Sequence, residues 1–213
     1  HPNSVRGVSF SPDGKYLAWL EIAQNRNYEI AIYDINNSAK IALINVEGES
    51  THFDFSNNSR QIVFTKERVV SAREKEGVFI YDIETGQEKV IAKNNLGDSN
   101  DPVDDMYYVG VNWNPRDSRI LLCRSLWESS EMDIFDATTN QMSINLGTHQ
   151  CGHWTPDGTK IVTFSTNGMW YGGAWIYEPQ TLKETQIIGN TKEVFDVYEV
   201  AMSSNGSILA LLT

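Results

Sequence analysis

One twelve-residue phrase recurs five times along the chain, and this repetition constrains the fold more than any other feature. The first copy, SFSPDGKYLAWL, begins at Ser9. The other copies are DFSNNSRQIVFT, NWNPRDSRILLC, HWTPDGTKIVTF and AMSSNGSILALL, which begin at Asp54, Asn112, His153 and Ala201. Successive copies start 45, 58, 41 and 48 residues apart. A repeat of this length indicates a fold built from one structural unit used several times.

Each copy of the phrase predicts a β-hairpin. In Ser11-Pro12-Asp13-Gly14, proline suits a φ of about −65° and glycine suits a positive φ, as a tight turn requires. Thr155 to Gly158 repeats this pattern, and the other copies place different turn-forming residues at the same point. The residues after each turn are continuously apolar, as in Ile62-Val63-Phe64. We therefore expect these strands to be buried on both faces.

A second phrase follows each of the first four copies and predicts a third strand. It reads EIAIYDI, GVFIYDI, EMDIFDA and GAWIYEP, and is rich in β-branched and aromatic residues. It ends near an acidic residue that can cap the next turn, and we expect this role for Asp34, Asp82 and Asp136. A shorter fourth strand follows in each copy. Four antiparallel strands per repeat of this length predict the blades of a β-propeller.

The repeats divide the chain into four complete blades and a half blade within one propeller domain, residues 1–213. Their expected limits are about 5–46, 50–93, 108–147 and 149–189, with the half blade at 197–213. We expect this chain to be part of a larger propeller. The half blade then offers an open strand edge that can pair with another chain.

The two phrases resemble the TolB-like and WD-like β-propeller repeats, most clearly at Ser9 to Leu20 and His153 to Phe164. Asp34 and Asp82 follow tyrosine rather than the tryptophan of WD repeats, which favours the TolB-like group. The resemblance implies a propeller fold and favours an extracytoplasmic location. It covers partner-binding scaffolds, propellers of prolyl-oligopeptidase-like serine peptidases and some polysaccharide lyases, so fold alone does not give function.

The composition excludes several classes of partner. The formal net charge of −11 argues against nucleic acid and anionic membrane surfaces, which both require basic patches. No apolar run approaches the roughly 18 residues that a membrane span needs. The sequence contains no recognised catalytic motif of the nucleophile-elbow, zinc-protease or phosphate-loop type. We therefore expect a non-catalytic protein without a cofactor.

The cysteines and histidines predict no metal site. We expect Cys123 and Cys151 to be buried free thiols, although adjacent blades can bring them close. His149 and His153 lie about 13 Å apart if the segment is extended at about 3.3 Å per residue, too far to share one ion. Four aspartates between residues 98 and 105 lack the alternating ligand spacing of a calcium loop.

Two long insertions and several aromatic residues predict a binding face for a protein or peptide partner. The insertions are residues 66–76 and 94–108, and propeller topology places them on one rim. The expected apolar contacts are Tyr107, Tyr108, Trp127, Trp170 and Tyr171, and the expected charged contacts are Asp101, Asp104 and Asp105. Exposed aromatic residues anchor partners, and the acids favour a basic one.

Two alternatives to this scaffold function remain open. The first is the propeller of a prolyl-oligopeptidase-like peptidase whose catalytic domain lies outside residues 1–213. The second is a carbohydrate-binding or lyase-type propeller, which would use the exposed aromatic residues together with His149 and His153.

Overall fold

The described part of the chain consists of β-strands, turns and short connections. The computed structural model describes residues 6–22, 28–46, 51–66, 77–95, 105–126, 130–146, 150–165, 173–189, 197 and 199–212. Within these ranges there is no helix, and hence none long and apolar enough to cross a membrane. The chain forms two compact units, His1–Trp113 and Asn114–Thr213, which are described separately.

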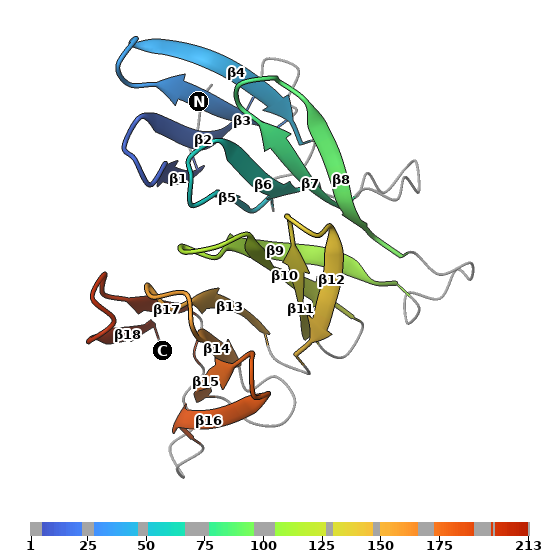
Figure 1. Ribbon diagram of the computed structural model, residues 1–213, viewed down its shortest axis with the longest axis vertical. Coiled ribbons are helices and arrows are strands. Elements are labelled where there is room, and N and C mark those ends of the chain that lie inside the picture. The colour runs from blue at the N-terminus through green and yellow to red at the C-terminus, as the bar shows by residue number, and fades with distance from the viewer. Residues whose placement is uncertain are drawn as a thin grey trace. The chain divides into compact units, whose positions relative to one another are not determined.

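The first unit contains two four-stranded antiparallel sheets and one further strand (Figure 1). The first sheet has the order β1-β2-β3-β4, with strands β1 (Arg6–Phe10), β2 (Tyr16–Ile22), β3 (Tyr28–Asp34) and β4 (Ala39–Asn45). The second sheet has the order β5-β6-β7-β8, with strands β5 (Phe53–Phe55), β6 (Gln61–Thr65), β7 (Gly77–Asp82) and β8 (Glu88–Lys93). Strand β9 (Tyr107–Trp113) completes the unit.

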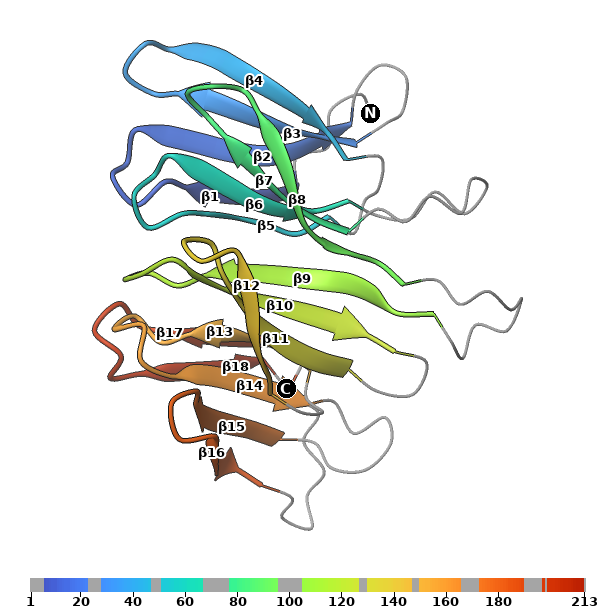
Figure 2. The ribbon, with the colours of Figure 1, turned by 45° about the vertical axis from the view of Figure 1, so that its right-hand side comes forward.

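The second unit repeats the same meander of adjacent strands (Figure 2). It begins with β10 (Arg119–Ser125), β11 (Ser130–Asp136) and β12 (Gln141–Asn145), and continues with a complete sheet in the order β13-β14-β15-β16. That sheet has strands β13 (Gln150–Trp154), β14 (Ile161–Ser165), β15 (Gly173–Glu178) and β16 (Lys183–Ile188). A two-stranded sheet, β17 (Glu199–Met202) and β18 (Leu209–Leu212), follows. The predicted four-stranded blades and terminal half blade of a β-propeller are confirmed.

The turn of the repeated phrase has a conserved hydrogen-bond pattern in four of the five copies. In the first copy, the Ser11 hydroxyl donates to Asp13 Oδ1 at 2.7 Å and accepts from the Tyr16 N–H at 2.8 Å. The bond from Ser11 holds the pKa of Asp13 below its usual value. Equivalent hydroxyl bonds join Ser56 to Asn58, Thr155 to Asp157 and Ser203 to Asn205. Asn114 replaces the hydroxyl residue in the remaining copy, where its side-chain oxygen accepts from the Arg116 N–H.

The acidic residues that end the third strands cap the next turns, as predicted. Asp34 accepts from the Asn37 N–H at 3.1 Å, and Asp136 accepts from the Thr138 N–H at 2.8 Å. Asp82 accepts from both the backbone N–H and the hydroxyl of Thr85. These bonds fix the hairpins between the third and fourth strands, because they satisfy backbone donors that the sheet leaves unpaired.

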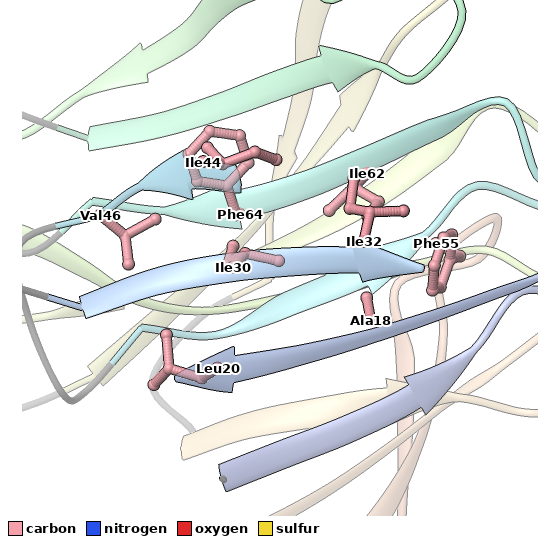
Figure 3. Close-up of a cluster of buried hydrophobic side chains, with 9 residues drawn as sticks. All are labelled: Ala18, Leu20, Ile30, Ile32, Ile44, Val46, Phe55, Ile62 and Phe64. Atoms are coloured by element: carbon pink, nitrogen blue, oxygen red, sulfur yellow. The ribbon is translucent and has the colours of Figure 1, made fainter. Parts of the chain in front are cut away.

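The core of the first unit lies between its two sheets (Figure 3). Ala18, Leu20, Ile30, Ile32, Ile44 and Val46 come from the first blade, and Phe55, Ile62 and Phe64 come from the second. Each of these side chains is at most 3 % exposed. The predicted two-sided burial is confirmed for β6, in which Ile62, Val63 and Phe64 are fully buried, and for β10. It is wrong for β2, where only alternate residues are buried, and for β18, whose residues are half-buried or exposed.

The expectation of free thiols is wrong. Cys123 is buried in β10 and disulfide-bonded, and Cys151 in β13 is the only other cysteine in the chain. Strands β10 and β13 contact each other within the second unit. The sequence spacing did not reveal the pair, because the two strands belong to different blades.

Candidate functional site

The described part of the expected binding face is the connection between β8 and β9 in the first unit. Of the eight predicted contact residues, the structure describes Asp105, Tyr107 and Tyr108. The other five lie outside the described residues: Asp101, Asp104, Trp127, Trp170 and Tyr171. Tyr107 and Tyr108 are the first two residues of β9 rather than part of a loop. The strand therefore begins before the point that the sequence suggested.

The base of this connection is closed by backbone and side-chain hydrogen bonds. Asn95 and Met106 form an isolated antiparallel bridge, in which each N–H donates to the other residue's carbonyl at 2.9 and 2.7 Å. The Asn94 side-chain oxygen, buried at the end of β8, accepts from the Tyr108 N–H at 2.9 Å. These bonds fix the backbone on both sides of Tyr107.

Tyr107 is the most accessible aromatic residue among the described residues of the β8–β9 connection. Its side chain is 38 % exposed, whereas Asp105, Met106 and Tyr108 are half-buried. A tyrosine on a hydrogen-bonded strand loses little conformational freedom on binding and offers both an apolar ring and a polar hydroxyl group. Asp105 lies two residues before Tyr107 in the chain.

The strands that border both long insertions end on one side of the first unit (Figure 2). Thr65 at the end of β6 pairs with Val78, and Gly77 at the start of β7 pairs with Lys93 near the end of β8. Lys66 follows β6, forms a 2.8 Å ion pair with Glu88 and places its ammonium 4.5 Å from the Phe79 ring centre. The described borders of the insertions thus share one end of the sheets, as expected for one rim.

A half-buried carboxylate that the sequence did not single out, Asp54, joins the second blade to β9. Asp54 Oδ2 accepts from the Asn112 side chain at 2.9 Å and from the Trp113 N–H at 2.8 Å. Its other oxygen accepts from the Phe55 N–H. Burial raises the pKa of Asp54 to about 6, against the opposing effect of these hydrogen bonds. The geometry assigns Asp54 to the joint between blades, since its oxygens already have protein partners.

In the second unit, Arg119 contributes to the joint between two blades. The Arg119 guanidinium lies 4.7 Å from the Trp154 ring centre, donates to the Gly158 carbonyl at 3.0 Å and pairs with Asp117. Asn114 Nδ2 also donates to the Gly158 carbonyl, at 2.9 Å. The Pro-Asp-Gly turn that ends at Gly158 is therefore attached to the turn of the preceding blade, which begins at Asn114. The side chains of Asn114 and Arg119 are used in this joint between blades.

The described residues contain no group of three or more His, Cys, Asp or Glu side chains placed to hold a metal ion. His153 is exposed in β13, and His149 lies outside the described residues. The predicted separation of these two histidines is therefore not tested by the structure.

Comparison with known proteins identifies the fold. No family model and no curated protein matches the chain. Similar solved structures include one from an analysis of two prolyl endopeptidases, with a TM-score of 0.72 and 11 % identity, where the match covers 99 % of this chain and 32 % of that one. They also include an oligogalacturonate lyase in complex with manganese, with a TM-score of 0.68 and 15 % identity. This match covers 98 % of this chain and 58 % of that one. A third is TolB from Acinetobacter baumannii, with a TM-score of 0.60 and 15 % identity. This match covers 96 % of this chain and 45 % of that one.

These similarities support a TolB-like propeller fold and do not separate the functions expected from the sequence. The chain spans between 32 and 58 % of the length of these three proteins. They include enzymes and TolB, and identities of 11 to 15 % establish shared architecture only. The chain has the fold of a β-propeller whose structural relatives include peptidases, a lyase and TolB.

Proposed function

We propose that the chain is a TolB-like binding propeller that presents the β8–β9 connection to a protein or peptide partner. The observation that carries the proposal is Tyr107, which is 38 % exposed on a backbone fixed by the Asn95–Met106 bridge and the Asn94 side chain. A preorganised aromatic residue is a typical anchor of an interface, because little entropy is lost when it is covered.

The charge of the chain favours a basic partner. Asp105 lies beside the anchor, and Asp101 and Asp104 belong to the same connection in the sequence. The net charge of −11 adds a long-range attraction for cations that salt screens. Tyr107 therefore supplies contact area, and the acids select lysine-rich or arginine-rich segments.

Selection from a random-peptide display library, with the purified chain as bait, tests this function. We expect enriched peptides to carry Lys or Arg beside an apolar residue and to bind more weakly as salt rises from about 50 to 300 mM. Tyr107→Ala should weaken binding of a selected peptide by about 10- to 100-fold, and Asp105→Asn should reduce its salt dependence. Leu182→Ala, at an exposed turn of the second unit, should change neither property.

The proposal fails if selected peptides bind Tyr107→Ala and the parent chain equally. Enrichment of acidic peptides, or affinity independent of salt, would contradict the proposed role of the aspartates. The peptidase-type and lyase-type functions have the same support from the fold and remain predictions from the resemblance.

The disulfide at Cys123 supports an extracytoplasmic location for this binding function. Structural disulfides persist in oxidising compartments and are rare in the cytosol. Mass spectrometry of the native protein, alkylated before reduction, should find no free thiol. Alkylation of both Cys123 and Cys151 would contradict this location.

A further inference from the structure

The turn between β3 and β4 carries an Asn-x-Ser sequence at the surface of the first unit. It reads Asn36-Asn37-Ser38, and all three residues are exposed. Asn-x-Ser and Asn-x-Thr are the acceptor sequences of N-linked glycosylation, which attaches a bulky polar group to the asparagine side chain. A folded protein can carry such a group only where the asparagine side chain is not needed for packing or hydrogen bonding.

The hydrogen bonds of this turn use Asn37 and leave the Asn36 side chain available. Asp34 Oδ1 accepts from the Asn37 N–H at 3.1 Å, and Asp34 Oδ2 accepts from the Asn37 side chain at 2.9 Å. The backbone N–H of Asn36 also bonds to Asp34. In the part of the chain that the structure describes, no hydrogen bond involves the Asn36 side chain. A substituent on its amide nitrogen would therefore break none of the bonds that close the turn.

The exposure of Asn36 is a property of the repeat, since the same turn of the second blade is exposed too. In the β7–β8 turn, Gly86 has a φ of 70° at the position of Ser38, whose φ is 52°. Glu84 occupies the position of Asn36 and is exposed, although the first blade packs against the second. A turn at this position thus remains in solvent in a blade that has a neighbour.

The other two Asn-x-Ser sequences of the chain are less suited to carry a glycan. In the second blade, Asn57 is half-buried. Its sequence ends at Ser59, which is 3 % exposed and has a hydroxyl that accepts from the Asp13 N–H at 3.1 Å. In the half blade, Asn205 is exposed, but its side-chain oxygen accepts three hydrogen bonds within its own turn. Of the three asparagines, only Asn36 combines an exposed position with a side chain that its turn does not use.

A neighbouring acid and the disulfide favour the same modification. Asp34 lies two residues before Asn36, and bacterial oligosaccharyltransferases select acceptors with an acidic residue at this position. The other two asparagines have Phe55 and Ser203 there. Oligosaccharides are transferred on the extracytoplasmic side of membranes, where disulfides such as that of Cys123 persist. The inference therefore rests on the extracytoplasmic location proposed above.

The β3–β4 turn lies at the end of the first unit opposite to the β8–β9 connection (Figure 2). The Ile35 N–H donates to the Lys15 carbonyl at 2.9 Å, which joins this turn to the end of the β1–β2 turn. The Asp13 N–H in turn donates to the Ser59 hydroxyl of the β5–β6 turn. Strand β6 begins at this end of the unit and reaches the border of a long insertion at the other. A glycan on the β3–β4 turn thus leaves the proposed binding face open.

We propose that Asn36 is the acceptor of an N-linked oligosaccharide. The donor is an oligosaccharide linked to a polyprenyl pyrophosphate. The Asn36 amide nitrogen attacks the anomeric carbon of the first sugar, and a carbon–nitrogen bond forms as the bond from that carbon to the pyrophosphate oxygen breaks. The nitrogen loses one proton, polyprenyl pyrophosphate leaves, and nothing is oxidised or reduced. The transfer precedes closure of the turn, and the folded chain then carries the glycan in solvent.

Secretion of the chain into the periplasm of bacteria that carry an oligosaccharyltransferase and its lipid-linked oligosaccharide tests the proposal. Peptide mapping by mass spectrometry should find the glycan on Asn36 and on neither Asn57 nor Asn205. Ser38→Gly should abolish the modification and still fold, because glycine suits the positive φ of Ser38, as Gly86 does in the second blade. A parent chain unmodified at Asn36, or a glycan that persists in Ser38→Gly, would overturn the proposal.

A stability measurement tests whether the folded turn accommodates the glycan. The glycosylated chain should unfold at no lower urea concentration than the same chain made without the transferase, because the Asn36 side chain forms no bond that the glycan would break. A lower midpoint would contradict the assignment of Asn36. Free thiols in the secreted chain would contradict the proposed location, whereas an unmodified Asn36 in a disulfide-bonded chain would contradict this inference alone.

Discussion

The first two blades share one repeat but bury it differently. Phe55 in the second blade is 3 % exposed, whereas Phe10 at the same position of the first blade is 63 % exposed. Phe64 is fully buried, and its counterpart Trp19 is half-buried and donates its indole N–H to Glu21 at 2.7 Å. The comparison teaches that a neighbouring blade decides whether an apolar repeat position becomes core.

The largest expected difference between these blades is in stability. Phe64→Ala should lower the free energy of unfolding by about 3–5 kcal/mol, because it leaves a cavity between the sheets. Phe10→Ala should change it by less than about 0.5 kcal/mol, as for an exposed residue. Urea unfolding in dilute solution, followed by tryptophan fluorescence, measures both. Equal losses of unfolding free energy in the two variants would contradict the proposed difference between the buried Phe64 and the exposed Phe10.

The joints between blades also differ, since the second unit contains a disulfide-bonded cysteine. The double variant Cys123→Ala/Cys151→Ala should lower the free energy of unfolding by about 2–4 kcal/mol, because the unfolded chain regains freedom. Urea unfolding of the oxidised parent chain gives the reference. An unchanged midpoint would show that the disulfide contributes little to this unit.

The turn at Gly158 tests the polar attachment in the second unit. Its φ is 68°, and a Cβ there would lie 2.4 Å from Asn114 Oδ1. Gly158→Ala should therefore cost about 2–3 kcal/mol, through backbone strain and displacement of Asn114. Gly14→Ala, with φ of 71° and open space around its Cβ, is the control and should cost about 1 kcal/mol. Equal losses would show that the contact with Asn114 is unimportant.

The Asp54 joint predicts the smallest effect and a distinct pH dependence. Its pKa of about 6 exceeds the usual 3.8, so the folded chain binds this proton more tightly than the unfolded chain. The stability contributed by this group should therefore decrease by about 2 kcal/mol as pH rises from about 4 to 7. Asp54→Asn should remove that component from the pH profile of the free energy of unfolding. A profile with the same slope would contradict the assignment.

The repeat made local structure predictable but not the contacts between blades. Pro12, Asp13 and Gly14 predicted a hairpin turn, and Asp82 predicted a cap, because each acts on backbone within a few residues. The bonds from Asn112 and Trp113 to Asp54 cross 58 and 59 positions. No local pattern distinguishes such an aspartate from a solvated one.

The candidate site was predictable only in part, for the same physical reason. The sequence indicated that Tyr107 belongs to a long connection between blades. It did not reveal that the Asn95–Met106 bridge closes this connection and lets β9 begin at Tyr107. The ion pairs Glu21–Lys40 and Lys66–Glu88 occupy the same two repeat positions in the first and second blades, with the charges exchanged. Aligning the fourth strands would have found them.

The most direct test is hydroxyl-radical footprinting of the chain at a concentration where it is monomeric. Mass spectrometry would compare the oxidation rates of Phe10 and Phe55, two chemically identical side chains at one repeat position. Exposures of 63 and 3 % predict that Phe10 is oxidised many times faster than Phe55. Equal rates would contradict the claim that a neighbouring blade alone turns this position into core.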